Sequence, residues 1–219
     1  MSPGARPARG GGRWVDVAAE RAERFLAGFA DRHGPVQVTA TPEVVRLVAA
    51  DGAVAECEVP FPPLPMDESL PYAGLVGHVL RDRRVGVVLV RRGGFAAGVF
   101  DGVRLVASKV GSRHVQGRTA AGGWSQQRFA RRREGQARVA WEAAAETVAA
   151  VLLPQWETLD AVVAGGDRSA CDEVLRDPRL VPLASLLVAR RLDVPEPRLR
   201  VLENTPAAFR AVRVRLIDP

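Results

Sequence analysis

The sequence is short of cysteine and of long hydrophobic runs, and each shortage excludes a class of protein. Its two cysteines, Cys57 and Cys171, lie far apart without a CxxC partner, which argues against a disulfide framework or a zinc site. We expect both to be small buried apolar residues. No stretch approaches the roughly 18 uninterrupted apolar residues of a membrane-spanning helix. No basic and apolar signal sequence opens the chain, so we expect a cytoplasmic protein without a membrane partner.

Positive charge is concentrated in one part of the 219-residue chain. The formal net charge is +6 at pH 7, and residues 109–133 contain seven basic side chains and no acid, which leaves −1 for the rest of the chain. The seven are Lys109, Arg113, Arg118, Arg128, Arg131, Arg132 and Arg133. Such a local excess indicates an anionic partner, of which nucleic acid is the most common.

The amino-terminal part of the chain predicts a tail followed by a small accessory unit. Residues 1–12 hold three adjacent glycines and two prolines, a composition typical of a disordered tail. Apolar residues from Trp14 to Phe29 recur at helical spacing and predict an amphipathic helix that ends near Gly34. Two valine-rich runs on either side of Asp51-Gly52 predict a β-hairpin over residues 44–59. We therefore expect a helix-and-hairpin unit over residues 13–66.

The remaining residues, 70–219, predict a catalytic domain of the α/β class in the broad sense that includes α+β. The expected strands are residues 85–90, 95–100, 103–108, 159–164 and 212–216. The expected helices are residues 72–80, 126–153 and 169–175, whereas residues 183–192 fit either a helix or a strand. A polar stretch over residues 111–125 lacks periodicity and is an expected loop. A meander followed by helix, strand and helix describes a mixed sheet flanked by helices.

The expected loop before the long helix has the features of a reactive segment. Gly122-Gly123 allows backbone conformations and close approaches that a side chain would prevent. The backbone N–H groups and the positive end of the following helix favour a phosphate or a developing oxyanion. A glycine pair in a loop is usually a simple turn, so the neighbouring residues decide between the two interpretations.

The neighbours of the glycine pair resemble a known catalytic loop. From Gly122 the sequence reads Gly-Gly-Trp-Ser-Gln-Gln-Arg-Phe-Ala-Arg-Arg-Arg-Glu, which resembles the Gly-Gly-Gln-Ser loop and the following Arg-Phe-x-Arg of eukaryotic and archaeal class 1 peptide-chain release factors. Trp124 stands where those factors have glutamine, and a glutamine follows two positions later, at Gln126. This Gly-Gly-x-x-Gln arrangement is similar to the actinobacterial branch of the VLRF (VMS-like release factor) family. The resemblance extends over roughly residues 85–180.

The resemblance implies a release-factor central-domain or ribonuclease-H-like fold and a peptidyl-tRNA hydrolase that releases nascent chains from stalled ribosomal particles. It assigns Gly122 and Gly123 to shaping the loop and Gln126 to positioning the attacking water. The implied partners are the ribosome or its large subunit, peptidyl-tRNA and ribosomal RNA, without a cofactor or a metal ion. The residues expected to contact RNA are Lys109, Arg113, Arg118, Trp124, Arg128, Arg131, Arg132 and Arg133.

Several alternatives remain open from the sequence. A glutamine amide can donate to and accept from one water, which favours ester hydrolysis, but proteins related to this family can instead cut the tRNA near its 3′ end. A non-catalytic ribosome- or RNA-binding module would result if Trp124 had displaced the essential glutamine. Trp124 itself either stacks on an exposed base or is buried. His114 lies near enough to the loop in sequence to move a proton, although the three histidines show no metal-ligand spacing.

Overall fold

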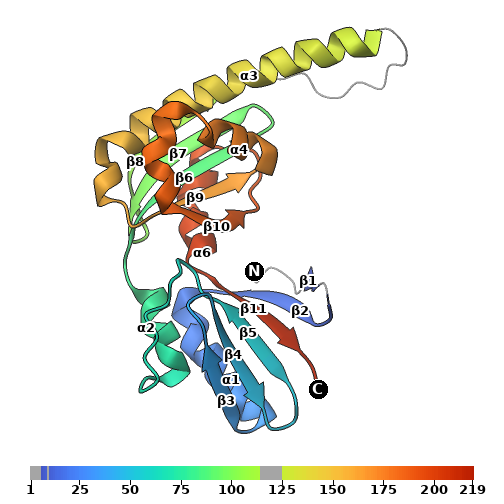
Figure 1. The fold of residues 1–219 in the computed structure, drawn as a ribbon, viewed down its shortest axis with the longest axis vertical. Helices are drawn as coiled ribbons and strands as arrows, with labels where there is room; N and C mark the ends of the chain where they lie inside the picture. The colour runs from blue at the N-terminus through green and yellow to red at the C-terminus, as the bar shows by residue number, and fades with distance from the viewer. Residues whose placement is uncertain (1–5, 9, 114–124) are drawn as a thin grey trace. The chain divides into compact units, whose positions relative to one another are not determined.

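The computed structural model describes the backbone of residues 6–8, 10–113 and 125–219, together with their side chains except those of residues 125–134 (Figure 1). Contacts divide the chain into two compact units. The first contains Met1–Arg81 and Pro206–Pro219, and the second contains Asp82–Thr205. Each unit is built around its own sheet.

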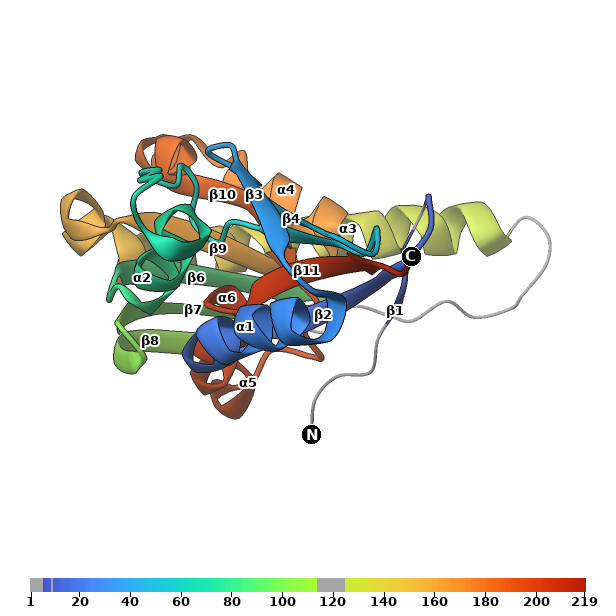
Figure 2. The ribbon, with the colours of Figure 1, turned by 90° about the horizontal axis from the view of Figure 1, so that it is seen from below.

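The first unit is an antiparallel sheet covered by helices on one face. Its strand order is β1 (Arg6–Pro7), β2 (Arg13–Val17), β11 (Val212–Ile217), β5 (Val54–Glu58), β4 (Val44–Ala49) and β3 (Val36–Ala40). Helix α1 (Ala22–His33), which follows the short 3-10 helix η1 (Ala19–Arg21), packs Leu26 and Phe29 against this sheet (Figure 2). The 3-10 helix η2 (Pro71–Gly74) and α2 (Leu75–Leu80) add Leu75 to the same core. Alternation along the strands buries one set of side chains in this core and places the other set on the opposite face.

The predicted helix over residues 14–29 is wrong in its first part, whereas the predicted hairpin is confirmed. Residues 13–17 form β2, in which Trp14 pairs with Arg215 and Asp16 with Arg213. The spacing of apolar residues could not reveal this strand, because its partner β11 lies at the other end of the chain. Arg6–Pro7, from the expected tail, pairs with Arg13 and Trp14 as β1.

The second unit is a mixed five-stranded sheet between helices. Its order is β10 (Leu187–Leu192), β9 (Ala161–Gly166), β6 (Arg84–Arg91), β7 (Gly94–Asp101) and β8 (Arg104–Ser112). Strands β10, β9 and β6 are parallel, and β6, β7 and β8 form the predicted antiparallel meander. The other elements are α3 (Ser125–Leu152), η3 (Leu153–Thr158), α4 (Arg168–Leu175), η4 (Pro178–Leu186) and α5 (Leu199–Glu203), while the short α6 (Thr205–Phe209) lies at the boundary of the units.

Helices α3 and α5 pack on opposite faces of this sheet. A Cβ added to Gly86 would meet Leu152 of α3, and one added to Gly98 would meet Leu202 of α5. Gly86 pairs with Val99, the strand neighbour of Gly98, so the two glycines face opposite sides. The expected α/β class with a mixed sheet flanked by helices is therefore confirmed. None of the helices in the described ranges is long and apolar enough to cross a membrane.

The remaining predictions about local structure are resolved by tertiary pairing. The long helix is confirmed as α3, and the ambiguous residues 183–192 divide into the end of η4 and strand β10, which pairs in parallel with β9. Cys57 and Cys171 are buried free thiols, as expected. The two compact units differ from the expected ranges 13–66 and 70–219, because β11 inserts between β2 and β5 in the first unit.

Candidate nucleic-acid interface

The site predicted from sequence begins at one edge of the second sheet. Strands β6, β8, β9 and β10 run in the same direction, so Arg91, Ser112, Gly166 and Leu192 end at a common edge, here called the carboxyl edge. The N–H of Arg113, just after β8, donates to the carbonyl of Gly93 in the β6–β7 turn at 2.8 Å. Arg113, the last described residue before the segment 114–124, therefore lies beside the β6–β7 turn.

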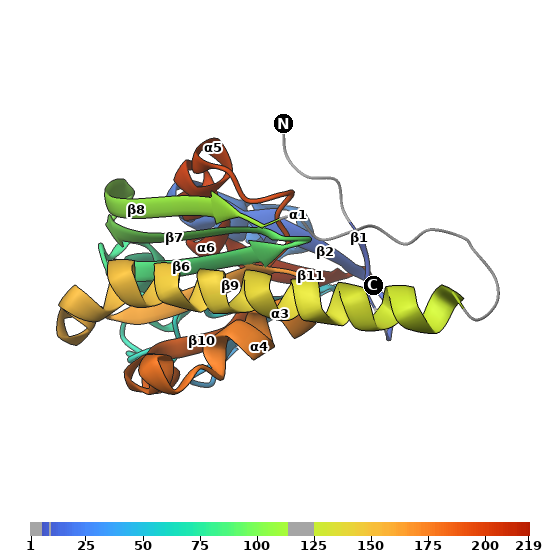
Figure 3. The same ribbon diagram turned by 90° about the horizontal axis from the view of Figure 1, so that it is seen from above.

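Helix α3 begins within the predicted catalytic segment, since its first residue is Ser125 and Gln126 comes next. Buried side chains in its described part begin at Ala140, and from there it packs on the sheet. Its amino-terminal part extends beyond the carboxyl ends of β6 and β8 (Figure 3). The first turns of α3 therefore project from the edge at which segment 114–124 begins.

The residues predicted for the site fall into three groups. His114, Arg118, Gly122, Gly123 and Trp124 lie outside the described residues. The backbone of the first turns of α3 contains Gln126, Arg128, Arg131, Arg132 and Arg133, whose side chains are also outside the description. Lys109 and Arg113 are described, and both are exposed on β8 or directly after it.

Two adjacent arginines, Arg91 at the end of β6 and Arg92 in the turn that follows, were not predicted from the sequence. Arg91 donates from Nη1 to the carbonyl oxygen of Val194, and the same nitrogen lies 3.6 Å from Oδ1 of Asp193. Its Nε lies 3.8 Å from Oδ1 of Asp167. These contacts hold the Arg91 side chain within the second unit. Gly93 and Gly94, which follow Arg92, indicated a turn in the sequence. They did not indicate which of the two arginines forms ion pairs.

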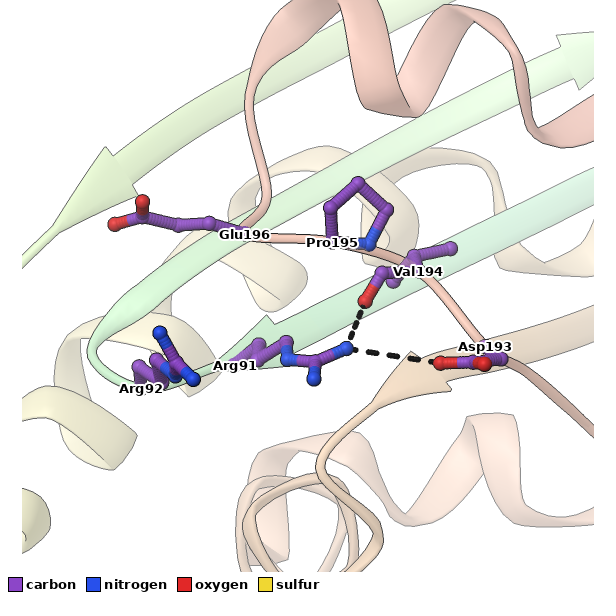
Figure 4. A pocket seen from close by; sticks show the side chains of 6 residues that line it. All are labelled: Arg91, Arg92, Asp193, Val194, Pro195 and Glu196. Atoms are coloured by element: carbon purple, nitrogen blue, oxygen red, sulfur yellow. Dashed lines mark hydrogen bonds and ion pairs between the residues drawn. The ribbon is translucent and has the colours of Figure 1, made fainter.

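Arg92 is exposed and has a left-handed backbone, with φ of +58°. Its N–H donates to Oδ2 of Asp167 at 3.1 Å, and the N–H of Asp167 donates to the carbonyl of Val90 at 2.8 Å. Figure 4 shows Arg91 and Arg92 lining a shallow pocket with residues 193–196; its dashed lines connect Arg91, and not Arg92, to the other residues drawn.

The acids near the carboxyl edge have basic partners of their own. Asp167 and Asp193 face Arg91, and Oε2 of Glu196 lies 3.6 Å from Nη2 of Arg198. Among the side chains that the structure describes, none forms an ion pair with Arg92, Lys109 or Arg113. These cations are therefore available to an external anion, and guanidinium groups suit phosphate well.

The described part of the site contains neither a reactive thiol nor a metal site. Burial raises the pKa of Cys171, whose Sγ donates to the carbonyl of Gly165 at 3.2 Å. A buried thiol of this kind is a poor nucleophile. Groups of three or more His, Cys, Asp or Glu residues that could hold a metal ion do not occur within the described ranges. The described residues thus form a cationic edge of the sheet, and the chain continues from Arg113 at this edge into the segment 114–124.

Comparison with known protein families gives one match. A profile described as the Actinobacteria/chloroflexi VLRF1 release factor matches residues 83–215, more than half of the chain. The matched range includes the carboxyl edge, segment 114–124 and α3. No curated protein matches this chain.

Several solved structures are similar at low sequence identity. The archaeal translation termination factor aRF1 has 16% identity and a TM-score of 0.44, covering 75% of this chain and 51% of that one. The Vms1 mitochondrial localization core has 10% identity and a TM-score of 0.44, covering 92% and 82%. Dom34 of S. cerevisiae, described as a translation termination-like factor, has 8% identity and a TM-score of 0.32, covering 94% and 66%. The chain spans about half the length of the archaeal factor.

Proposed function

Since this chain belongs to the Actinobacteria/Chloroflexi VLRF1 release factor family, we propose that it is a ribosome-associated peptidyl-tRNA hydrolase that releases nascent chains from stalled ribosomal particles. One observation carries the proposal: in the sequence, Gly122-Gly123-Trp124 stands between Arg113 at the cationic carboxyl edge and α3, whose first turn contains Gln126, and all of these residues fall inside the range that matches the family. The ribosomal substrate implies action in the cytoplasm.

In the proposed reaction, Gln126 holds a water against the ester that joins the peptide to the tRNA. Gln126 belongs to the first turn of α3, where free backbone N–H groups and the helix dipole favour developing negative charge. The water oxygen bonds to the carbonyl carbon, the bond to the ribose oxygen breaks, and that oxygen takes up a proton. Gly122 and Gly123 allow the backbone to approach the ester closely. A neutral amide catalyses by positioning, so the reaction needs no group with a shifted pKa.

We propose that basic side chains on both sides of the glycine pair bind RNA phosphate. Lys109 and Arg113 supply charge from the end of β8, and Arg128, Arg131, Arg132 and Arg133 supply it from the first turns of α3. Cations at the amino end of a helix oppose its dipole, so their presence there favours a function in binding. Arg118 and Trp124 are proposed to contact RNA from the segment between, the tryptophan by stacking on a base.

The test is to incubate the purified protein with large ribosomal subunits that carry labelled peptidyl-tRNA, and to analyse both products. Free peptide together with tRNA whose 3′ CCA end is intact on a sequencing gel would support hydrolysis. Peptide that remains attached to a short CCA fragment would contradict it and establish the tRNA-cleaving alternative. Binding without either product would leave a ribosome-binding module.

A further inference from the structure

We propose that Arg92, in the turn between β6 and β7, is a phosphate-contacting residue that extends the RNA-binding surface onto the carboxyl edge, and that Asp167 presents it. This inference rests on the proposed ribosomal function but concerns a residue outside the catalytic segment and α3. It is carried by three features of the described residues: the backbone conformation of Arg92, the hydrogen bonds of Asp167, and the difference between Arg91 and Arg92.

The backbone at position 92 favours a residue other than arginine. Arg91 pairs with Gly94, so Arg92 and Gly93 form a two-residue turn in which both have positive φ, +58° and +127°. Turns of this type strongly prefer asparagine or glycine at their first position. The hairpin would form at least as well with glycine, so folding does not explain an arginine here. An exposed arginine at a strained backbone position favours a function for its side chain.

Asp167 fixes the turn from the neighbouring strand. It follows Gly166, whose φ is +103° and where an added Cβ would lie 2.1 Å from the carbonyl oxygen of Val90. This close approach lets the N–H of Asp167 donate to Val90 while Oδ2 accepts the N–H of Arg92 at 3.1 Å. The Asp167 carboxylate thus binds the backbone N–H of Arg92. The Arg92 guanidinium forms no ion pair with a described side chain. Arg92 is held in place without being neutralised.

The two adjacent arginines are used in opposite ways. Arg91 contacts Val194 and Asp193, which attach β6 to the segment after β10, and it also contacts Asp167, which follows β9. Arg92 is exposed, and Figure 4 draws no ion pair between it and Asp193 or Glu196. Because the backbone is already fixed, only side-chain entropy is lost on binding, and the guanidinium can hold a phosphate through two parallel hydrogen bonds.

The position of the turn connects Arg92 to the proposed RNA surface. Gly93, the next residue, accepts a hydrogen bond from Arg113, which immediately precedes residue 114. The turn and the end of β8 are therefore one hydrogen-bonded unit. A phosphate bound by Arg113 lies next to the turn, so the same RNA strand can reach Arg92.

Binding of purified large ribosomal subunits by the full chain, measured by sedimentation over a range of salt concentrations, tests this inference. Arg92→Gly removes the charge and suits the left-handed turn, so the midpoint of unfolding should stay the same or rise. One lost phosphate contact should flatten the slope of log K against log salt by about 0.7 and weaken binding roughly fourfold at about 0.15 M salt. Arg92→Lys should retain most of the affinity.

The matched control is Arg104→Ala, which removes one positive charge from the opposite edge of the same sheet. Arg104 begins β8, and its side chain is 74% exposed, 3.5 Å from Asp101. It should leave both the affinity and the slope unchanged. If Arg92→Gly binds like the wild type, or if Arg104→Ala loses as much as Arg92→Gly, the assignment of Arg92 is overturned while the proposed function stands. If the wild-type protein does not bind large subunits, both the proposed function and this inference fail.

Discussion

Arginines on the first sheet and arginines at the carboxyl edge of the second unit have different partners. In the first unit, Arg215 lies 3.3 Å from Glu56 and Arg213 lies 3.8 Å from Glu58, so cross-strand carboxylates neutralise them. At the carboxyl edge of the second unit, Arg92 and Arg113 form no ion pair with any described side chain. In an arginine-rich chain, the number of arginines therefore does not locate an anion-binding surface.

Two hairpin turns show the same difference. In the turn between β4 and β5, Oδ1 of Asp51 accepts the N–H of Ala53 at 2.9 Å, and Oδ2 lies 2.8 Å from Nδ1 of His33. The side chain of that turn stabilises its own unit. In the turn between β6 and β7, the stabilising carboxylate comes from Asp167 on another segment, and the turn side chain itself, Arg92, is exposed. The first turn therefore contributes to stability, whereas the exposed side chain of the second turn suits the binding proposed for it.

The largest effect that the comparison predicts is in the catalytic segment of the second unit. Gly123→Ala should reduce peptide release to the background rate and leave ribosome binding nearly intact, because a Cβ would block a close approach or a positive φ. Single-turnover release of labelled peptide measures this. Gly135→Ala is the control, since a Cβ at Gly135 of α3 meets nothing within 4 Å. Full activity of Gly123→Ala would show that the glycine pair is an ordinary turn.

A smaller effect is expected from the arginines of α3. Replacing Arg131 and Arg132 together by alanine should flatten the salt slope of ribosome binding by about 1.4 and weaken binding roughly tenfold at about 0.15 M salt. The control with equal charge loss is Arg46→Ala with Arg213→Ala on the first sheet, which should not change the slope. If both double variants lost ribosome affinity equally, the arginines of α3 would have no special part in binding.

Arg215→Ala should destabilise the protein without affecting ribosome binding. The Arg215 guanidinium donates to the carbonyls of Gly10 and Gly11 and lies beside Glu56, with its side chain 21% exposed. Losing these partly buried contacts should cost about 1 kcal/mol of unfolding free energy. Denaturant unfolding measures the loss. A changed salt slope in this variant would place the first sheet in the binding surface.

The smallest effect concerns the pH dependence of the turn at Asp51. The N–H of Ala53 and, next, the hydrogen bond with His33 lower the pKa of Asp51 below its usual value of 3.8. A lowered pKa stabilises the folded state above pH 3.8, and this stabilisation is lost as pH falls through the folded-state pKa. The wild type should therefore lose its advantage over Asp51→Asn as the pH falls below 3.8 in unfolding measurements. If the difference in unfolding free energy between the wild type and Asp51→Asn did not change with pH, the ionised Asp51 carboxylate would not be the stabilising group.

Local signals predicted most of the second unit, whereas long-range pairing produced the errors. The meander and the helix Ser125–Leu152 follow from periodicity and turn residues, which act over a few positions. Trp14 was assigned to a helix because its pairing with Arg215 cannot be read from local spacing. Arg92 was missed for a related reason. Arg91 and Arg92 are neighbours and look equivalent in sequence. Only the positions of Asp167 and Asp193 in the folded chain distinguish them.

The rate of peptide release by Gln126→Ala tests the central claim most directly, because the chain provides a matched control in the neighbouring Gln127. Labelled peptide freed from large subunits in a single turnover should form more slowly with Gln126→Ala by a factor on the order of 10² or more, since the water is no longer positioned. Gln127→Ala should release peptide at nearly the wild-type rate, and both variants should bind subunits equally well. Release by Gln126→Ala at the wild-type rate would contradict the claim that this chain hydrolyses peptidyl-tRNA through its Gly-Gly-x-x-Gln segment.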